Sequence, residues 1–436
     1  MSCQAGDSGG GSRELMRGSS MTLGGTAKVF VPAGMEAEQN AVEQLAMCLA
    51  DQRAVAGALM ADHHLGYSMP IGGVVAYDGA ISPSGVGFDI ACGNKAVLTP
   101  LHADDIEGDL HKIMANVQQT VAFGVGRNND TPFDHALFDR HDATLRELDK
   151  FGGKKLALSQ KARAQLGTVG SGNHYVDLLA DEQDRVWIAN HFGSRGLGHT
   201  IATGFLNLAA DQPFDHQGAE KEEPTVIPTD SDLGQFYIDA MTLAGDYAYA
   251  GRDYVIEQVL GILETKAIES VHCHHNFAWF EDGLWVVRKG ATPLTTDGAF
   301  IGGSMGDGAV IVRGTGEDIG NLSSAPHGAG RVMSRTKAAG RFKKETVERT
   351  APDGSTYTKK IRVRDASTAA VDWPTVKAGL SERGIVVLGS GADEAPEVYK
   401  PLDDVLAAHS NIEVVHRLRP LGVVMAGDDI FDPYKD

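Results

Sequence analysis

The sequence predicts a single α+β domain that carries its functional residues on loops. Patterns typical of helices and of strands are intermixed along the 436 residues, without the regular alternation that parallel βαβ units produce. No Pro- or Ser-rich linker divides the chain, and no internal repeat is visible. A chain of this length can bury a large core. We therefore expect one core, with the chemistry on the loops that connect its elements.

Helices are predicted where apolar side chains recur every three or four residues. The first such segment, residues 36–61, includes Cys48 at a position that favours packing against the core. Further segments with this periodicity are 105–122, 134–150, 231–268 and 401–409.

Strands are predicted where short runs rich in Val, Ile and aromatic residues alternate with glycine turns, as in residues 63–98. Glycine makes up 53 of 436 residues, about 12% against a typical ~7%, which favours tight turns where the backbone approaches a ligand. Residues 345–364 predict a hairpin closed by the Pro-Asp-Gly turn at 352–354. Other strand-like runs are 166–180, 185–198, 271–280, 284–290, 309–314 and 412–424.

The net charge of −19 excludes a surface that binds nucleic acid non-specifically, because such binding depends on basic side chains. Any nucleic acid must therefore be bound by a local basic segment. Residues 331–349 are the candidate, with seven Arg or Lys against two Glu. A solvated helix face is the alternative interpretation of this segment.

The sequence shows no signal for membrane insertion or export. It has no apolar run near the ~18 residues of a membrane span, and its N-terminus lacks an apolar segment with a cleavage site. We expect a cytoplasmic enzyme, with a monomer as the default state. Residues 1–20 predict a disordered leader, with Met21 as a candidate internal start. Residues 21–425 predict the folded domain and 426–436 a C-terminal extension.

Residue types that bind metals lie beside glycines at several predicted loops. Asp89 and Cys92 form a D-x-x-C pair in GFDIACG, and the histidines in comparable positions are His64, His174, His191 and His275. Together these groups could hold one or two divalent cations. A lone histidine is more often a hydrogen-bonded core residue, so both interpretations stay open at this point. Four cysteines are too few for a disulfide scaffold.

Three common catalytic motifs are incomplete or absent. Gly302–Gly306, GGSMG, matches the G-x-S-x-G elbow of α/β-hydrolases, but the regular parallel-sheet pattern around such an elbow is missing. No G-x-x-x-x-G-K-[ST] segment occurs, which excludes a P-loop NTPase. H-E-x-x-H is also absent, which excludes the common metalloprotease class.

The segment SSAPHGAGRVMSR, residues 323–335, combines a histidine, a glycine turn and two arginines. A neutral His327 imidazole could attack an α-phosphate and form a phosphoramidate. The glycines would admit phosphate oxygens to backbone N–H groups. Arg331 and Arg335, on one face if the segment is helical, could neutralise phosphate charge. The alternative is a structural histidine in a helix N-terminal turn.

Taken together, these motifs make the chain resemble the RtcB-type RNA-splicing ligases, from about residue 55 to residue 425. The motifs that carry the resemblance are DHHLGYSMPIGGV, GVGFDIACG, GTVGSGNHYVD, HFGSRGLG, HCHHNFA, RKGA, GSMG, SAPHGAGRVMSRTKA and DEAPEVYK. The resemblance implies central β-sheets flanked by helices around a metal-binding cleft. It also implies an enzyme that uses GTP and two Mn²⁺ ions. Such an enzyme joins RNA 2′,3′-cyclic phosphate or 3′-phosphate ends to 5′-hydroxyl ends, in RNA repair or tRNA splicing.

The resemblance also implies roles for individual residues. His327 would be the nucleophile that carries GMP, and Asp62 a further carboxylate of the site. The implied manganese ligands are Asp89, Cys92, His174, His191 and His275, with the Cys92 thiolate bridging both ions. The implied contacts to nucleotide and phosphate are Asn173, Asp177, Arg195, Lys289, Ser304, Arg331 and Tyr399. By softness alone a Cys/His site favours Zn²⁺, so manganese rests on the resemblance.

The sequence departs from the family pattern where a base would be recognised. Met425 stands where a lysine is expected, Asp307 and Ala309 stand where Thr and Ser are common, and Asp177 is shorter than the family's glutamate. Methionine cannot donate a hydrogen bond to a base, which would weaken discrimination by ~1–3 kcal/mol. Two hypotheses follow. One is a GTP-dependent ligase; the other is a paralogue that binds nucleotide or nucleic-acid ends with little sealing. An activating protein partner is compatible with either.

Overall fold

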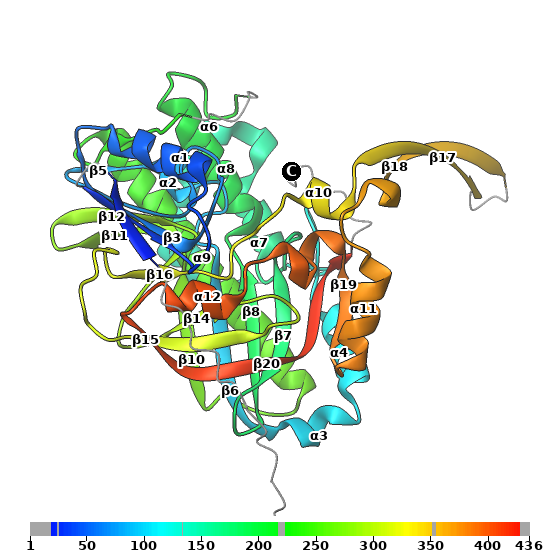
Figure 1. The fold of residues 1–436 in the computed structure, drawn as a ribbon. Coiled ribbons are helices and arrows are strands. Elements are labelled where there is room, and N and C mark those ends of the chain that lie inside the picture. Colours follow the sequence, from blue (N-terminus) through cyan, green and yellow to red (C-terminus); the bar gives the residue numbers. More distant parts are fainter. Residues whose placement is uncertain (1–18, 24–25, 133, 217–222, 351–354, 428–436) are drawn as a thin grey trace, which may run out of the picture.

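The fold is described from a computed structural model of the chain (Figure 1). The structure describes residues 19–23, 26–132, 134–216, 223–350 and 355–427. The expected leader lies outside the described residues except for Ser19 and Ser20, which open a strand. The expected C-terminal extension lies outside them except for Ala426 and Gly427, which end one. Within the described ranges, every helix is too short or too polar to cross a membrane.

Two large β-sheets form the body of the molecule, and each brings together strands from distant parts of the sequence. The first sheet has the strand order β1 (Ser19–Leu23), β2 (Ala27–Val31), β3 (Ala54–His64), β4 (Ile71–Tyr77), β12 (Leu284–Lys289), β11 (Asn276–Glu281). The second has the order β10 (Glu269–His274), β6 (Gly93–His102), β8 (Arg185–Phe192), β7 (Tyr175–Ala180), β20 (Ile412–Gly427), β15 (Ala309–Gly314), β14 (Ala299–Gly302), with β19 (Val386–Ser390) parallel beside β20. These mixed sheets with helices around them confirm the predicted α+β class.

The helices lie around and between these sheets (Figure 1). Their bounds are α1 (Gln39–Leu49), α2 (Pro83–Val86), α3 (Ala103–Glu107), α4 (Leu110–Thr120), α5 (Ala136–Arg140), α6 (Asp142–Leu156), α7 (Leu158–Gln165), α8 (Arg195–Leu208), α9 (Asp232–Ile262), α10 (Arg335–Ala339), α11 (Trp373–Glu382) and α12 (Leu402–Ala407). Three short 3₁₀ turns are Ala366–Thr368, Ala392–Glu394 and Pro396–Val398.

Helix α9 is the central element of the largest core cluster. Its N-cap is Ser231, whose side chain accepts a hydrogen bond from the backbone N–H of Gly234 at 3.0 Å. Tyr237 and Tyr247 are buried in that cluster, which also includes side chains of α1, β3, β4, α6 and α8. Further along, α9 contacts β6 and β8 of the second sheet. It therefore joins the two halves of the body.

The predicted helix over residues 36–61 is wrong in its second half. Helix α1 ends at Leu49, and residues 54–64 form strand β3 instead. Residues 57–63 of β3 are all buried, because β3 is a central strand with both faces covered. A strand buried on both faces carries no alternation of polar and apolar residues, so its apolar run resembles a continuing helix. Cys48 is buried on α1, in agreement with the predicted packing role.

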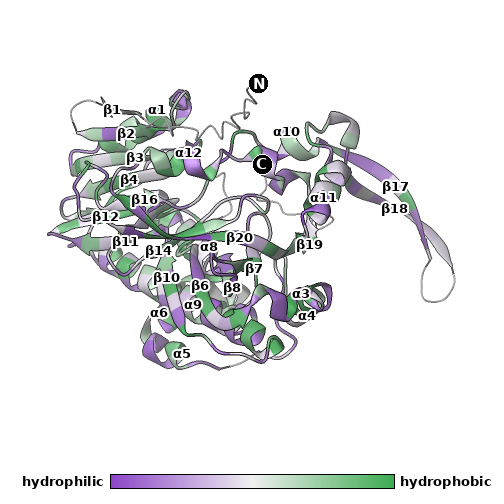
Figure 2. Cartoon of the chain, turned by 60° about the horizontal axis from the view of Figure 1, so that its bottom comes forward, coloured by the Kyte–Doolittle hydropathy of each residue, from purple (hydrophilic) through white to green (hydrophobic). Residues whose placement is uncertain are grey.

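Smaller pairings complete the fold. The pairs are β5 (Ala80–Ile81) with β9 (Ile227–Pro228), β13 (Ala291–Pro293) with β16 (Ser324–Pro326), and β17 (Phe342–Thr350) with β18 (Thr356–Arg364). The β17–β18 pair is the hairpin predicted at 345–364, and its Pro-Asp-Gly turn lies outside the described residues. Figures 1 and 2 both show this hairpin projecting away from the body.

Candidate functional site

Most of the predicted site residues line one cavity of about 1320 Å³, formed where loops of both sheets meet. The predicted residues on its wall are Asp89, Cys92, Asn173, Asp177, His191, His275, Lys289, Ser304, His327, Arg331 and Tyr399. His174 lies directly behind this wall, in contact with Asp89 and Cys92. Arg195, the first residue of α8, does not line the cavity; its Nε donates to the Thr168 hydroxyl at 3.4 Å. The structure therefore gathers the dispersed motifs in one place.

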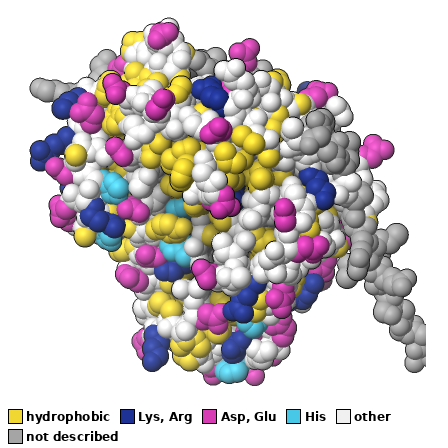
Figure 3. All heavy atoms as spheres, turned by 90° about the vertical axis from the view of Figure 1, so that its left-hand side faces the viewer, with side chains coloured by type: hydrophobic (Ala, Val, Ile, Leu, Met, Phe, Trp, Pro, Cys, Tyr) yellow, Lys and Arg dark blue, Asp and Glu magenta, His cyan; other side chains and the backbone are white. Residues whose placement is uncertain are grey.

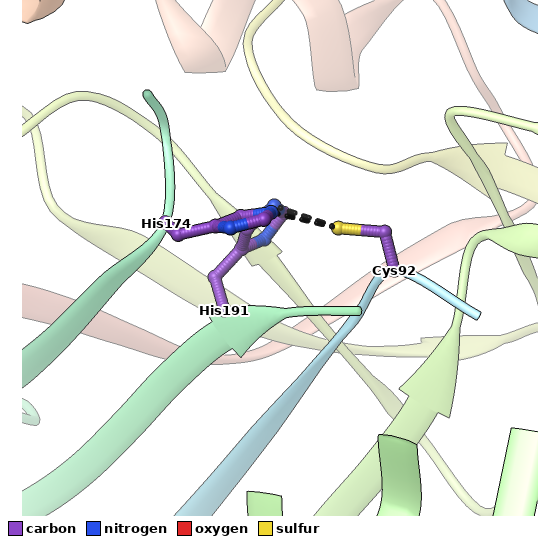
Figure 4. Close-up of side chains that lie close together, drawn as sticks. All are labelled: Cys92, His174 and His191. Carbon is purple, nitrogen blue, oxygen red and sulfur yellow. Dashed lines mark hydrogen bonds between the residues drawn. The ribbon is translucent and has the colours of Figure 1, made fainter. Parts of the chain in front are cut away.

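Cys92, His174 and His191 form the group best suited to hold a metal ion among the described residues (Figure 4). Their ligand atoms all lie within 4.8 Å of one another, and all three residues are buried. The Cys92 Sγ lies 3.5 Å from the Nε2 of His174 and 3.4 Å from the Nε2 of His191. Asp89 extends the group, since its Oδ2 lies 3.0 Å from the same His174 nitrogen.

Backbone geometry explains the glycines in these motifs. A Cβ on Gly193 would lie 2.2 Å from the Asp89 Oδ1, and a Cβ on Gly93 would lie 2.2 Å from the backbone oxygen of Cys273. Neither position can hold a side chain without moving the segment that carries the ligands. The glycines beside the candidate ligands therefore allow these protein segments to approach one another closely.

The imidazole of His191 is held in one orientation by its neighbour on the next strand. Asn94 of β6 lies opposite His191 of β8, and its Oδ1 accepts a hydrogen bond from His191 Nδ1 at 2.7 Å. This leaves the lone pair on Nε2, the nitrogen that faces Cys92. His275 stacks on His191 with ring centroids 5.0 Å apart, and its backbone N–H donates to the Cys92 carbonyl at 2.8 Å.

The protonation states of this group suit a cation. Burial, reinforced by Asp89, raises the pKa of the Cys92 thiol well above its ordinary value. Burial also lowers the pKa of His191 and of His275 well below the usual range, so both imidazoles are neutral at pH 7. Although burial opposes ionisation, His174 and Arg195 lower the pKa of Asp89 to about 2. The wall therefore offers neutral imidazoles, a carboxylate and a thiol that a divalent cation would deprotonate.

Two further observations show that the donor set fits a divalent metal. The Nδ1 atoms of His174 and His275 are buried and have no hydrogen-bond partner among the described residues. Buried polar atoms are usually satisfied, so these imidazoles retain capacity for a ligand. Sulfur and imidazole nitrogen are soft or borderline donors, which bind first-row transition metals in preference to Mg²⁺ or Ca²⁺.

Arg252 is a site residue that the sequence analysis missed. Its side chain is fully buried, and Nη1 donates to the backbone carbonyls of Ala91 at 3.0 Å and Phe192 at 2.7 Å. These carbonyls belong to the residues next to Cys92 and His191. The guanidinium therefore fixes the two segments that carry those candidate ligands. The sequence signal that could have identified it is a single arginine within the largely apolar segment that forms α9.

His327 is bound to a buried carboxylate. Its Nδ1 donates to Asp62 Oδ2 at 2.7 Å, and the backbone N–H groups of His327 and Gly328 donate to the same oxygen at 3.1 and 3.3 Å. Burial opposes ionisation, but His327 and Lys400 hold the pKa of Asp62 below its usual value. When Nδ1 carries the hydrogen of this bond to Asp62, Nε2 of the neutral imidazole carries the lone pair.

His327 also lies next to the candidate metal ligands. Its ring centroid is 4.8 Å from that of His275, which in turn stacks on His191. Gly330, in the same motif, has a φ of +75°, and a Cβ there would lie 2.0 Å from the backbone oxygen of Asp62. The glycine turn therefore places the His327 loop against the end of β3 that carries Asp62.

The helical spacing predicted for Arg331 and Arg335 is wrong, because Arg331 precedes α10 and pairs with Tyr399 in an isolated β-bridge. The two guanidiniums still converge, on the 3₁₀ turn that contains Asp393 and Glu394. Arg331 Nη2 donates to the Asp393 carbonyl at 2.8 Å, and Arg335 Nη1 to the Asp393 carboxylate at 3.1 Å and to Glu394. Sequence reasoning missed this acidic pair, which orients both arginines at the cavity wall.

Asp177, Ser304, Tyr399 and Met425 also line the cavity. The family resemblance implies nucleotide contacts for the first three, so we call these four residues the base end. Ser304 Oγ donates to Asp307 Oδ2 at 3.0 Å, and the Tyr399 hydroxyl donates to Glu394. Burial raises the pKa of the Asp177 carboxyl well above its ordinary value, and Asp177 Oδ1 has no hydrogen-bond partner among the described residues.

Two lysines bind backbone carbonyls at the edge of the cavity. Lys289 ends β12 and donates to the carbonyl of Tyr67. Lys400 donates to the carbonyls of Ala61 and His63, both at 2.9 Å. These carbonyls flank Asp62, so Lys400 positions the carboxylate that binds His327.

Comparison with known proteins is consistent with this geometry. A family model described as tRNA-splicing ligase RtcB matches residues 44–378. The RNA-splicing ligase RtcB of Escherichia coli strain K12 is 34% identical over 400 residues, covering 83% of this chain and 88% of the relative. The tRNA-splicing ligase RtcB of Archaeoglobus fulgidus is 32% identical, covering 88% of this chain and 91% of the relative. An RNA-splicing ligase RtcB homolog of Entamoeba dispar is 31% identical over 84% of this chain.

Proposed function

The chain belongs to the RtcB family of RNA-splicing ligases, and we propose that it joins RNA ends through a covalent His327–GMP intermediate formed from GTP. The ends are a 2′,3′-cyclic phosphate or 3′-phosphate and a 5′-hydroxyl. One observation carries the proposal. His327, bound through Nδ1 to Asp62 at 2.7 Å, faces the same cavity as Cys92, His191 and His275.

The first covalent step follows from the tautomer that Asp62 imposes. The Nε2 of His327 attacks the α-phosphorus of GTP, the bond to the β-phosphate oxygen breaks, and pyrophosphate leaves. The Nδ1 proton stays in the hydrogen bond to Asp62, whose negative charge stabilises the positive charge that develops on the ring. Lys289, Arg331 and Asn173, all on the cavity wall, bind phosphate oxygens in this step.

The residues that would hold two Mn²⁺ ions are Asp89, Cys92, His174, His191 and His275. When bound there, the ions supply positive charge that stabilises the Cys92 thiolate and polarises phosphate oxygens. Arg252 holds the segments of Cys92 and His191 through the carbonyls of Ala91 and Phe192.

The remaining steps transfer GMP and then release it. Water opens a cyclic phosphate to a 3′-phosphate. An oxygen of the RNA 3′-phosphate attacks the phosphorus of His327–GMP, so that the N–P bond breaks and GMP becomes attached to the RNA end. The 5′-hydroxyl of the second RNA then attacks the 3′-phosphate, loses its proton and expels GMP. In this proposal Tyr399 stacks on the base, and Asp177 and Ser304 recognise its edge; all three residues line the cavity.

The test is a labelling experiment with α-labelled GTP. The wild-type protein should form an acid-labile adduct, and His327→Ala should abolish it. His416→Ala is the matched control, because this β20 histidine does not line the cavity. Its side chain contacts Glu182 and the ring of Trp187. An undiminished adduct in His327→Ala would contradict the assignment.

A second candidate function is binding of nucleotide or nucleic-acid ends without sealing. The observation that favours it is the base end of the cavity, where Met425 is buried and Ser304 is hydrogen-bonded to Asp307. A gel assay with a 2′,3′-cyclic-phosphate RNA and a 5′-hydroxyl RNA separates the two. Joined product supports the ligase. Labelling of His327 without joined product supports the binding protein.

A further inference from the structure

The hairpin of β17 and β18 is an exposed arm, and none of its described side chains belongs to a core cluster. Its nine cross-strand pairs run from Phe342 opposite Arg364 to Thr350 opposite Thr356. Along β17 every side chain is exposed except the half-buried Val347. A two-stranded hairpin with both faces in water is only marginally stable by itself. Here its root is tied to the body, since Arg364 Nη1 donates to the Gly340 carbonyl at 2.9 Å.

The charge of the arm is opposite to that of the molecule. Its two strands contain seven Lys or Arg against two Glu, whereas the whole chain has 39 Lys and Arg against 58 Asp and Glu. On one face of the body, Lys and Arg side chains are interspersed with Asp and Glu side chains (Figure 3). The arm is therefore a local concentration of positive charge on an acidic protein.

Four of the seven basic residues lie on one face of the hairpin. Residues directly opposite each other in an antiparallel pair share a face, and alternate residues along a strand return to it. By this register Phe342, Lys344, Lys360, Arg362 and Arg364 lie on one face, which we call the basic face. Glu348 lies on the same face nearer the tip.

The basic face also includes an aromatic platform. The Phe342 ring is 37% exposed, with the guanidinium carbons of Arg364 and Arg362 at 3.9 and 5.8 Å from its centroid. Guanidinium groups bind phosphate through two parallel hydrogen bonds, and exposed aromatic rings stack with bases of single strands. On the opposite face, Lys343 is paired with Glu345 at 3.1 Å and Asp365 at 3.7 Å, which offsets its charge.

The arm starts beside the cavity. Arg331 and Arg335 line the cavity, Arg335 is the first residue of α10, and β17 begins three residues after α10 ends. Nine residues of strand extend about 30 Å, at ~3.3 Å per residue. An arm of this length can contact several successive phosphates of a strand that leaves the cavity.

We propose that the basic face of the β17–β18 hairpin binds the phosphate backbone of the RNA strand that leads away from the end held in the cavity. The inference rests on the proposed function for the kind of nucleic acid. Its physical basis is charge complementarity, because binding of phosphates by Lys and Arg releases condensed counterions. This contact is independent of sequence and adds affinity for RNA ends that carry a long flanking strand.

The test compares the wild-type protein with Lys344→Gln/Arg362→Gln by fluorescence anisotropy, on labelled 3′-phosphate RNAs of about 20 and about four nucleotides. On the long RNA, the variant should bind about tenfold or more weakly, and the slope of log K against log salt should fall by about 1.5–2. On the short RNA, the variant and the wild type should bind equally.

Two control variants remove the same charge elsewhere. Arg417→Gln/Arg419→Gln removes two exposed arginines of β20, and Lys343→Gln/Arg349→Gln removes two basic residues from the opposite face of the hairpin. Both should retain most of the affinity of the wild type. Unchanged binding of the test variant, equal losses on the short RNA, or equal losses in either control would overturn the proposal. The proposal would also be overturned if the test variant kept its affinity for RNA but lost binding to a protein partner.

The GTP-labelling assay is run on the same variants. The test variant should label as the wild type does, because His327 is unaltered. If the wild type fails to label yet shows the predicted RNA binding, the proposed function fails and the inference about the hairpin stands. If labelling is normal and the hairpin variant binds RNA as the wild type does, only the inference fails.

Discussion

The two ends of the cavity are built differently. We call the candidate ligands Asp89, Cys92, His174, His191 and His275 the metal end. The ligand atoms of Cys92, His174 and His191 lie within 4.8 Å of one another, and Asn94 holds His191 from the next strand. At the base end, Ser304 and Tyr399 direct their hydroxyls to other protein groups. Met425 presents a buried thioether.

This difference indicates that the metal ligands and the nucleophile are positioned more precisely than the groups that would recognise a base. A metal group and a nucleophile need donors placed within fractions of an ångström, and supporting hydrogen bonds from Asn94, Arg252 and Asp62 supply that placement. Selectivity for one base needs unpaired donors and acceptors at the base edge. The base end offers few, so we expect transfer chemistry with relaxed base preference.

The largest expected effect comes from removing the thiol at the metal end. Cys92→Ala should lose bound divalent metal in elemental analysis and reduce GTP labelling and RNA joining by ~10³-fold or more, since several kcal/mol of charge stabilisation are lost. Cys48→Ala removes another buried thiol, packed in the core on α1, and should retain metal and activity. Retention of a full metal complement by Cys92→Ala would show that the metal end does not depend on this thiol.

Next in size is the carboxylate that orients the nucleophile. Asp62→Asn keeps the shape but removes the charge that stabilises the ring of His327 during attack, so labelling should slow by ~10²–10⁴-fold. Metal content should not change, because Asp62 contacts His327 and not the Cys92 group. A loss of metal together with labelling would instead indicate collapse of the whole cavity.

Arg252 links the metal end to helix α9, and its removal should have a smaller effect. Arg252→Met leaves the carbonyls of Ala91 and Phe192 without their donor, and metal affinity should fall by ~10–100-fold. Arg288→Met is the matched control. Arg288 is equally buried but binds Glu281 and Ser324, so its loss should lower the melting temperature without changing metal affinity. Equal metal affinities in the two variants would exclude the positioning role of Arg252.

The contrast between Cys92 and Arg252 shows what the sequence could predict about the site. Cys92 and its partner histidines stand beside glycines at strand ends, and both the residue type and the local conformation are visible in short motifs. Arg252 acts through carbonyls more than fifty residues away in sequence, at Ala91 and Phe192. Nothing in its own neighbourhood on α9 predicts those partners, because they depend on how the helix packs against the second sheet.

The same limit applies to the fold. The α+β class and the long helix α9 follow from local patterns, and so does the β17–β18 hairpin. Strand β3 does not, because complete burial of residues 57–63 removes the alternation that would mark a strand. Asp62 lies in that strand, directly after residues 54–61, whose type was predicted wrongly.

Of two substitutions at the base end, Met425→Lys should change nucleotide selectivity more than Asp177→Asn. Met425 lies opposite Tyr175 in the β7–β20 register and lines the cavity. An ammonium at this position could donate to a base carbonyl, so the ratio of labelling by GTP to labelling by ATP should rise by about tenfold. Met425→Leu conserves volume without a donor and should leave the ratio unchanged. A high ratio already present in the wild type would show that other groups recognise guanine.

The smallest expected effect on chemistry comes from Asp177→Asn, whose main signal is in stability. Burial raises the pKa of Asp177 in the folded protein above its unfolded value, so the folded state binds the proton more tightly. The folded state therefore loses stability as pH rises from ~4 toward the raised pKa, by up to ~1.4 kcal/mol per pH unit.

The Asp177→Asn variant has no titratable group at this position, so its free energy of unfolding should lack this pH-dependent contribution. In metal-free protein, urea unfolding at several pH values between 5 and 8 should show the variant gaining stability relative to the wild type as pH increases. A constant difference across this range would mean that Asp177 is ionised in the folded protein. Its carboxylate would then be available to accept hydrogen bonds from a base, and the base end would be more selective than its contacts indicate.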